Sequence, residues 1–122
     1  MNTSETHIPL GSADCTTALS AVSDALYVIG GKWKLRIIIG LADGPRRFNE
    51  LQRLITGISA KVLSNELKDL ELNGFVTRKV FADSIPVMVE YERTEYADTL
   101  KEVLGALRNW GTLHRNKIMQ RS

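Results

Sequence analysis

The segment from Arg46 to Gly74 constrains the fold most, because it has the pattern of two short amphipathic helices joined by a glycine turn. Arg46 and Arg47 are expected to open the first helix. The second helix is expected at residues 59–73, where the Ser59 hydroxyl can cap the first turn and a glycine follows the last. Leucines at helical spacing give this helix one apolar face: Leu63, Leu67 and Leu70.

Two strands are expected directly after these helices. Residues 75–81 form the first, which carries the cations Arg78 and Lys79 on opposite faces. Residues 87–91 form the second, where apolar side chains alternate in the period of two that marks a half-buried strand. A helix-turn-helix followed by such a hairpin is the outline of a winged helix. The fold class is therefore predicted as α+β, mostly helical.

Long helices are expected on both sides of this motif. An amphipathic helix starts at about Thr16, and Thr94 is placed to cap a last helix. The apolar side chains of the last helix recur every 3.5 residues on average, the spacing of a helix that packs along another: Tyr96, Leu100, Val103, Leu107 and Trp110. We expect residues 1–14 to form a flexible leader and residues 15–119 to form one domain.

The composition is that of an ordinary soluble protein of one domain, with 122 residues and a net charge of only +2. The distribution of charge is more informative, because residues 44–81 contain seven Lys and Arg residues against four acids. No apolar run is long enough to span a membrane, and a single cysteine excludes an internal disulfide framework. We therefore expect a cytoplasmic protein with no membrane partner.

The outer face of the helix at 59–73 has the side chains that reading double-stranded DNA requires. The major groove admits one helix, and bases are read there by short polar groups while cations meet phosphates. The candidate reading residues are Ser59, Lys61, Ser64, Asn65 and Lys68. Candidate contacts to the DNA backbone are Arg46, Arg47, Arg78 and Lys79. The alternative is a winged-helix protein-interaction module whose basic face is only solvated surface.

Several blocks of the sequence resemble the HxlR family of winged-helix regulators, which is related to the MarR group. They lie at residues 26–33, 41–51, 57–64, 67–76, 89–94 and 110–111. The resemblance implies a homodimeric transcriptional regulator whose N-terminal and C-terminal helices form the dimer interface. It implies two reading helices on a pseudo-palindromic operator. The chain departs from the family at Thr16, where proline commonly follows the cysteine, and at Ala97, where glycine is usual.

Cys15 is a candidate sensor of a redox or electrophile signal, because several members of the family sense oxidants or electrophiles through a cysteine just before the first helix. A helix N-terminus favours the reactive thiolate, and a dimer would bring two copies of Cys15 together. The neighbouring Asp14 opposes the thiolate, and a single cysteine is often a small buried apolar residue. Both interpretations of Cys15 are open at this stage.

Other chemistry is not indicated. The Gly30-Gly31-Lys32 run lacks the remaining residues of a phosphate-binding loop. His7 and His114 are too far apart to form a metal site with Cys15, and no cofactor or catalytic group is predicted. An enzyme is therefore not expected. An apolar pocket between the dimer helices and the DNA-binding core would be a natural site for a small-molecule effector. Its candidate lining is Tyr27, Trp33, Leu104 and Trp110, and packing in the core is the favoured role for each of them.

Overall fold

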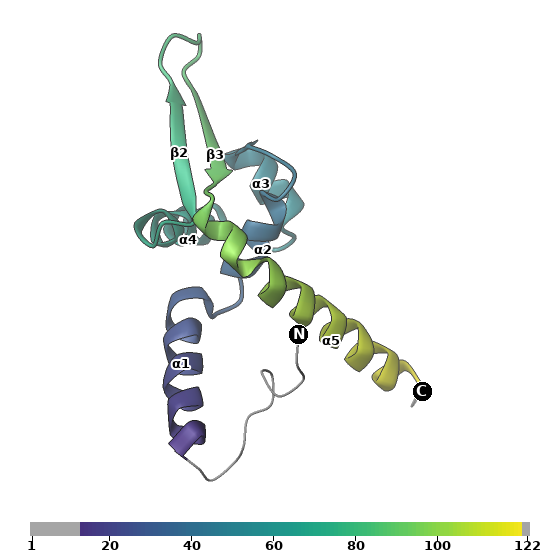
Figure 1. The fold of residues 1–122 in the computed structure, drawn as a ribbon. Coiled ribbons are helices and arrows are strands. Elements are labelled where there is room, and N and C mark those ends of the chain that lie inside the picture. Colours follow the sequence, from purple (N-terminus) through teal and green to yellow (C-terminus); the bar gives the residue numbers. More distant parts are fainter. Residues whose placement is uncertain (1–12, 121–122) are drawn as a thin grey trace. The chain divides into compact units, whose positions relative to one another are not determined.

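The structure, a computed structural model, describes residues 13–120 and confirms the α+β, mostly helical winged-helix fold (Figure 1). The chain divides between Lys32 and Trp33 into two units. The first unit contains helix α1 (Ala13–Ile29), which begins three residues before the predicted start. Most of the predicted leader, with His7, lies outside the described residues, and the last two leader positions belong to α1.

The second unit contains the winged helix itself. Its elements are α2 (Lys34–Gly40), β1 (Arg46–Arg47), α3 (Phe48–Leu54), α4 (Ala60–Leu72), β2 (Val76–Phe81), β3 (Met88–Arg93), a 3-10 segment η2 (Tyr96–Leu100) and α5 (Lys101–Met119). Helices α2, α3 and α4 enclose the core, whose fully buried side chains are Ile37, Leu41, Leu51, Leu63, Leu67 and Leu70. In Figure 1 the β2–β3 hairpin projects away from these helices as the wing.

The sheet has three antiparallel strands in the order β1–β3–β2, one more than the predicted hairpin. Arg46 pairs with Tyr91 and Arg47 with Glu90 on one side of β3, and residues 76–81 pair along its other side. The prediction that Arg46 and Arg47 open a helix is therefore wrong. The backbone of Arg47 is extended, with φ −82° and ψ 159°, and its N–H donates to the Glu50 carboxylate at 2.7 Å. This contact starts α3 at Phe48.

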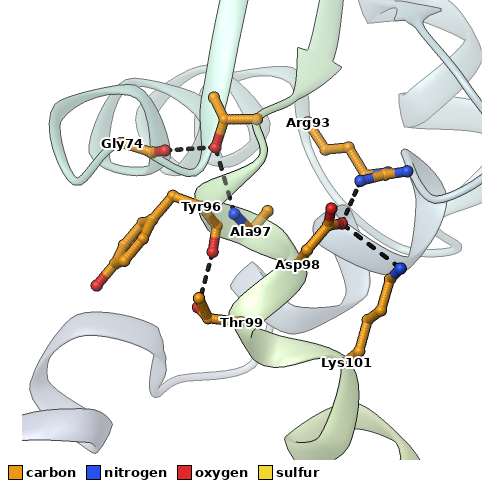
Figure 2. A network of polar contacts seen from close by, with 8 residues as sticks. Gly74, Arg93, Tyr96, Ala97, Asp98, Thr99 and Lys101 are labelled. Carbon is orange, nitrogen blue, oxygen red and sulfur yellow. Dashed lines mark hydrogen bonds and ion pairs between the residues drawn. The ribbon is translucent and has the colours of Figure 1, made fainter.

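The prediction that Thr94 precedes a long C-terminal helix is confirmed, except that the first turn is 3-10. The Thr94 hydroxyl accepts a hydrogen bond from the Ala97 N–H at 3.3 Å and donates to the Gly74 carbonyl at 2.6 Å. Figure 2 shows this contact beside Asp98, whose carboxylate pairs with Arg93 and, at 3.9 Å, with Lys101. The end of α4 is thereby joined to the start of the C-terminal helix.

Candidate nucleic-acid interface

Helix α4 is formed and held as its sequence predicts. The Ser59 hydroxyl accepts the Val62 N–H at 3.2 Å, which satisfies one of the donors that a helix start leaves unpaired. The three predicted leucines are all buried. Gly74 follows the helix with φ 83°, a left-handed conformation that suits glycine and lets the chain turn into β2. A helix fixed at both ends and along one face presents its opposite face in a defined orientation.

That opposite face contains three of the predicted reading residues. Successive residues of an α-helix are about 100° apart, which places Lys61, Asn65 and Lys68 together on the side away from the buried leucines, and all three are exposed. Ser64 lies to one side and is half-buried, and Ser59 caps the helix. Leu72 shares the reading face and is 84% exposed. Its spacing of four residues from Lys68 marks this position in the sequence, although the sequence interpretation did not include it.

The four candidate backbone contacts divide between the two faces of the sheet. Side chains of residues directly opposite each other in adjacent strands point to the same face. Arg46 and Arg78 therefore flank Tyr91 on one face, and Arg47 and Lys79 flank Glu90 on the other. Arg46 is turned toward α2, because its Nε donates to the Gly40 carbonyl at 2.6 Å. Arg47 and Arg78 are exposed.

The positive charge of the wing lies on its strands and not in the loop at its tip. The ammonium of Lys79 lies 3.1 Å from the Glu92 carboxylate, so one of its two predicted cations already has an acidic neighbour. The sequence between Lys79 and Arg93 has no Lys or Arg and includes Asp83. The tip is instead apolar, with Ile85 99% exposed and Val87 also exposed. Any phosphate contact by this wing through a cation must come from its strands.

Lys34 links α2 to α4, a contact that the sequence interpretation missed. Its ammonium donates to the Glu66 carboxylate at 3.0 Å and lies 3.4 Å from the Asp69 carboxylate, and its side chain is only 14% exposed. Burial lowers the pKa of this ammonium, but the hydrogen bonds and charges of Glu66 and Asp69 outweigh burial, so the pKa is raised above its usual 10.5. The lysine therefore stays charged between two acids of α4.

A groove of about 540 Å³ lies on the second unit. Apolar side chains of α2 and α3 and two arginines line it: Arg36, Ile39, Gly40, Asp43, Arg46, Leu54, Ile55 and Thr56. None of the four predicted lining residues is among them. Arg36 lies over the Trp33 ring, 5.4 Å from its centroid, and Tyr27 on α1 is exposed. The groove is therefore a different site from the effector pocket predicted from the sequence, and that pocket stays a prediction.

The flanking helices each expose an apolar stripe. On α1 it consists of Leu19, Val22 and Leu26, and on α5 of Val103, Leu107 and Trp110. Trp110 stacks on His114 with ring centroids 4.9 Å apart. Cys15 lies in the first turn of α1 and is half-buried. Stripes of this kind, at the spacing of a helix pair, are typical of surfaces that another helix covers.

Within residues 13–120 no His, Cys, Asp and Glu side chains cluster to hold a metal ion. The same residues include no helix that is both long and apolar enough to cross a membrane.

The HxlR-like helix-turn-helix family matches residues 28–119, most of the chain and all of the winged helix. The chain belongs to the HxlR family.

Relatives of this HxlR-family chain agree with the geometry. The HTH-type transcriptional regulator YtcD of Bacillus subtilis is 41% identical over 98 residues, which cover 80% of this chain and 77% of YtcD. The redox regulator HypR in its reduced form is 36% identical with a TM-score of 0.75, over 82% of this chain and 98% of HypR. The oxidised form of HypR is 38% identical with a TM-score of 0.71, over 75% and 94%. The chain is therefore a helix-turn-helix transcriptional regulator, and the prediction that it is not an enzyme is confirmed.

Proposed function

We propose that the protein is a homodimer that binds a pseudo-palindromic operator in double-stranded DNA and reads it with α4. The observation that supports this most is the exposed Lys61–Asn65–Lys68 face on a helix that a cap, a glycine turn and three buried leucines hold in place. A reading helix must be rigid, because hydrogen bonds to base edges depend strongly on direction. The competing function, a protein-interaction module, would need no such polar face.

Each candidate residue has a role that follows from its position. Asn65 is suited to a bidentate contact with adenine, and Lys61 and Lys68 to guanine or phosphate. Ser64 can reach either base type from the edge of the face. Ser59 acts at the N-terminus of α4, where backbone N–H groups also favour phosphate. We assign contacts with the phosphate backbone of DNA to Arg46, Arg47, Arg78 and Lys79.

Asn65→Ala is expected to reduce discrimination between operator and random DNA by roughly 1–3 kcal/mol, because it removes one bidentate base contact. Fluorescence anisotropy with a labelled operator and a scrambled duplex of equal length, at the same salt concentration, measures this. Asn116→Ala on the exposed surface of α5 is the matched control and should bind both duplexes as the wild type does. Equal losses on operator and scrambled DNA would show that Asn65 does not read bases.

The dimer part of the proposal is supported by the exposed apolar stripes on α1 and α5. Two reading helices related by a two-fold axis fit half-sites about one turn of DNA apart.

Two further statements stay predictions: that a small-molecule effector binds the protein, and that the protein is located in the cytoplasm. Reading DNA with α4 requires no cofactor.

Cys15 is proposed as the residue through which oxidation acts, supported by its place in the first turn of α1 and by the likeness to HypR, a redox regulator. Diamide should convert two Cys15 thiols, one from each protomer, to a disulfide. The two thiols lose two protons and two electrons, which reduce the azo bond of diamide to a hydrazine. Non-reducing electrophoresis should then show a covalent dimer that Cys15→Ser lacks. A monomer band in treated wild-type protein would contradict a disulfide between protomers.

A further inference from the structure

Lys34 occupies an unusual position for a lysine, because its largely buried ammonium lies between helices α2 and α4. It is the first residue of α2, yet both of its acidic partners are on the reading helix, 32 and 35 positions later in the sequence. Lysine is seldom buried unless its charge is paired. Here the pairing is double, and one contact is a hydrogen bond of 3.0 Å.

One of the two acids, Asp69, lies beside the residue assigned to base reading. Asp69 is four positions after Asn65, so the two side chains are neighbours on the surface of α4. The side chain of Asp69 is 54% exposed, and that of Glu66 is 20% exposed. Asp69 therefore borders the face that would approach DNA, and Glu66 lies further round the helix toward the buried leucines, on the side where α2 packs.

Carboxylates at this border are unfavourable for DNA binding. Phosphates line both edges of the major groove, and a like charge near them weakens binding to any sequence. The cation of Lys34 lies within 3.4 Å of both carboxylates, so its field opposes theirs at the distances where phosphates would lie.

We propose that Lys34 is a positioning residue of the DNA interface, which masks the charges of Glu66 and Asp69 and thereby lets the reading helix approach phosphates. This inference rests on the proposed function. It assigns to α2 a share in DNA affinity although no residue of α2 needs to touch DNA.

A double-mutant cycle tests the proposal. Lys34→Met keeps most of the side-chain volume but removes the charge, and it should weaken binding to the operator and to a scrambled duplex by a similar factor, roughly tenfold. Asp69→Asn should tighten the binding of the wild type to both duplexes by up to a similar factor, because one cation offsets only one of the two negative charges and this variant removes the other. The same substitution in the Lys34→Met protein should restore several-fold of the lost affinity. Lys34→Arg should bind nearly as the wild type does.

The controls separate masking from a merely structural role. The melting temperature of each variant shows whether it is folded at the assay temperature. If Lys34→Met does not fold, Lys34→Gln replaces it. A loss on the operator alone that Asp69→Asn does not restore would overturn the proposal, and so would unchanged binding by Lys34→Met. If the wild type does not prefer its operator over scrambled DNA, the proposed function itself fails and this inference fails with it. Operator preference by the wild type establishes that function whatever Lys34→Met does.

Discussion

Leu67→Ala is expected to lower the free energy of unfolding by about 2–5 kcal/mol, the range for removing a buried leucine side chain and leaving a cavity. Leu67 is 1% exposed and lies in the middle of α4, between two other buried leucines. Domains of this size have a total stability of about 5–15 kcal/mol, so the loss is a large part of it. Urea denaturation followed by circular dichroism measures the change, at one fixed protein concentration because a dimer is more stable when concentrated.

Leu72→Ala is the matched control, since it makes the same chemical change in the same helix at a side chain that is 84% exposed. It should leave the free energy of unfolding within about 0.5 kcal/mol of the wild type. A comparable loss for both variants would mean that Leu67 is not packed as the structure has it, or that Leu72 is buried in the assembled protein.

The reading helix could be predicted because its signals are local. Ser59, the three leucines and Gly74 fall within 16 consecutive residues, and each acts on its own helix. The face opposite the leucines follows from helical geometry alone, so the exposure of Lys61 and Asn65 was predictable as well. What these residues bind is not contained in that geometry, and the family shows only that the chain is a helix-turn-helix transcriptional regulator.

Strand β1 was not predictable in the same way. Arg46 and Arg47 precede a helix and carry no strand pattern, and they become a strand only because β3, more than 40 residues later, offers an edge to pair with. Lys34 was missed for the same reason, since its partners on α4 lie more than 30 positions away. Contacts of this range depend on how the helices pack, and a local pattern does not show them.

In the wing, the sequence shows which residues are charged, but it does not show which of these charges are paired with an acid. Arg78 and Lys79 are adjacent, and the sequence analysis assigned both of them to contacts with the DNA backbone. The register places Lys79 next to Glu90 across the strand and brings its ammonium to Glu92, whereas Arg78 lies opposite Tyr91. Exposed ion pairs contribute little to stability, but they reduce the net charge that a phosphate meets. Arg78 is thus the stronger candidate for a wing contact to DNA.

Leu107→Asp is expected to break the proposed dimer and with it most of the operator affinity. Leu107 is at the centre of the exposed stripe on α5, and a charge buried there without a partner costs about 3 kcal/mol or more. The dissociation constant of the dimer should therefore rise by at least about a hundredfold. A monomer holds only one reading helix, so binding to a full operator should fall toward binding to a half-site. Analytical ultracentrifugation measures the first effect and anisotropy the second.

Asn109→Asp is the control, because it adds the same charge two positions along α5 on another side of the helix, where the side chain is also exposed. It should leave a dimer with nearly the operator affinity of the wild type. Wild-type protein that sediments as a monomer at micromolar concentration would contradict the dimer directly. Dimeric Leu107→Asp would instead place the interface elsewhere, with the stripe on α1 as the remaining apolar surface of sufficient length among the described residues.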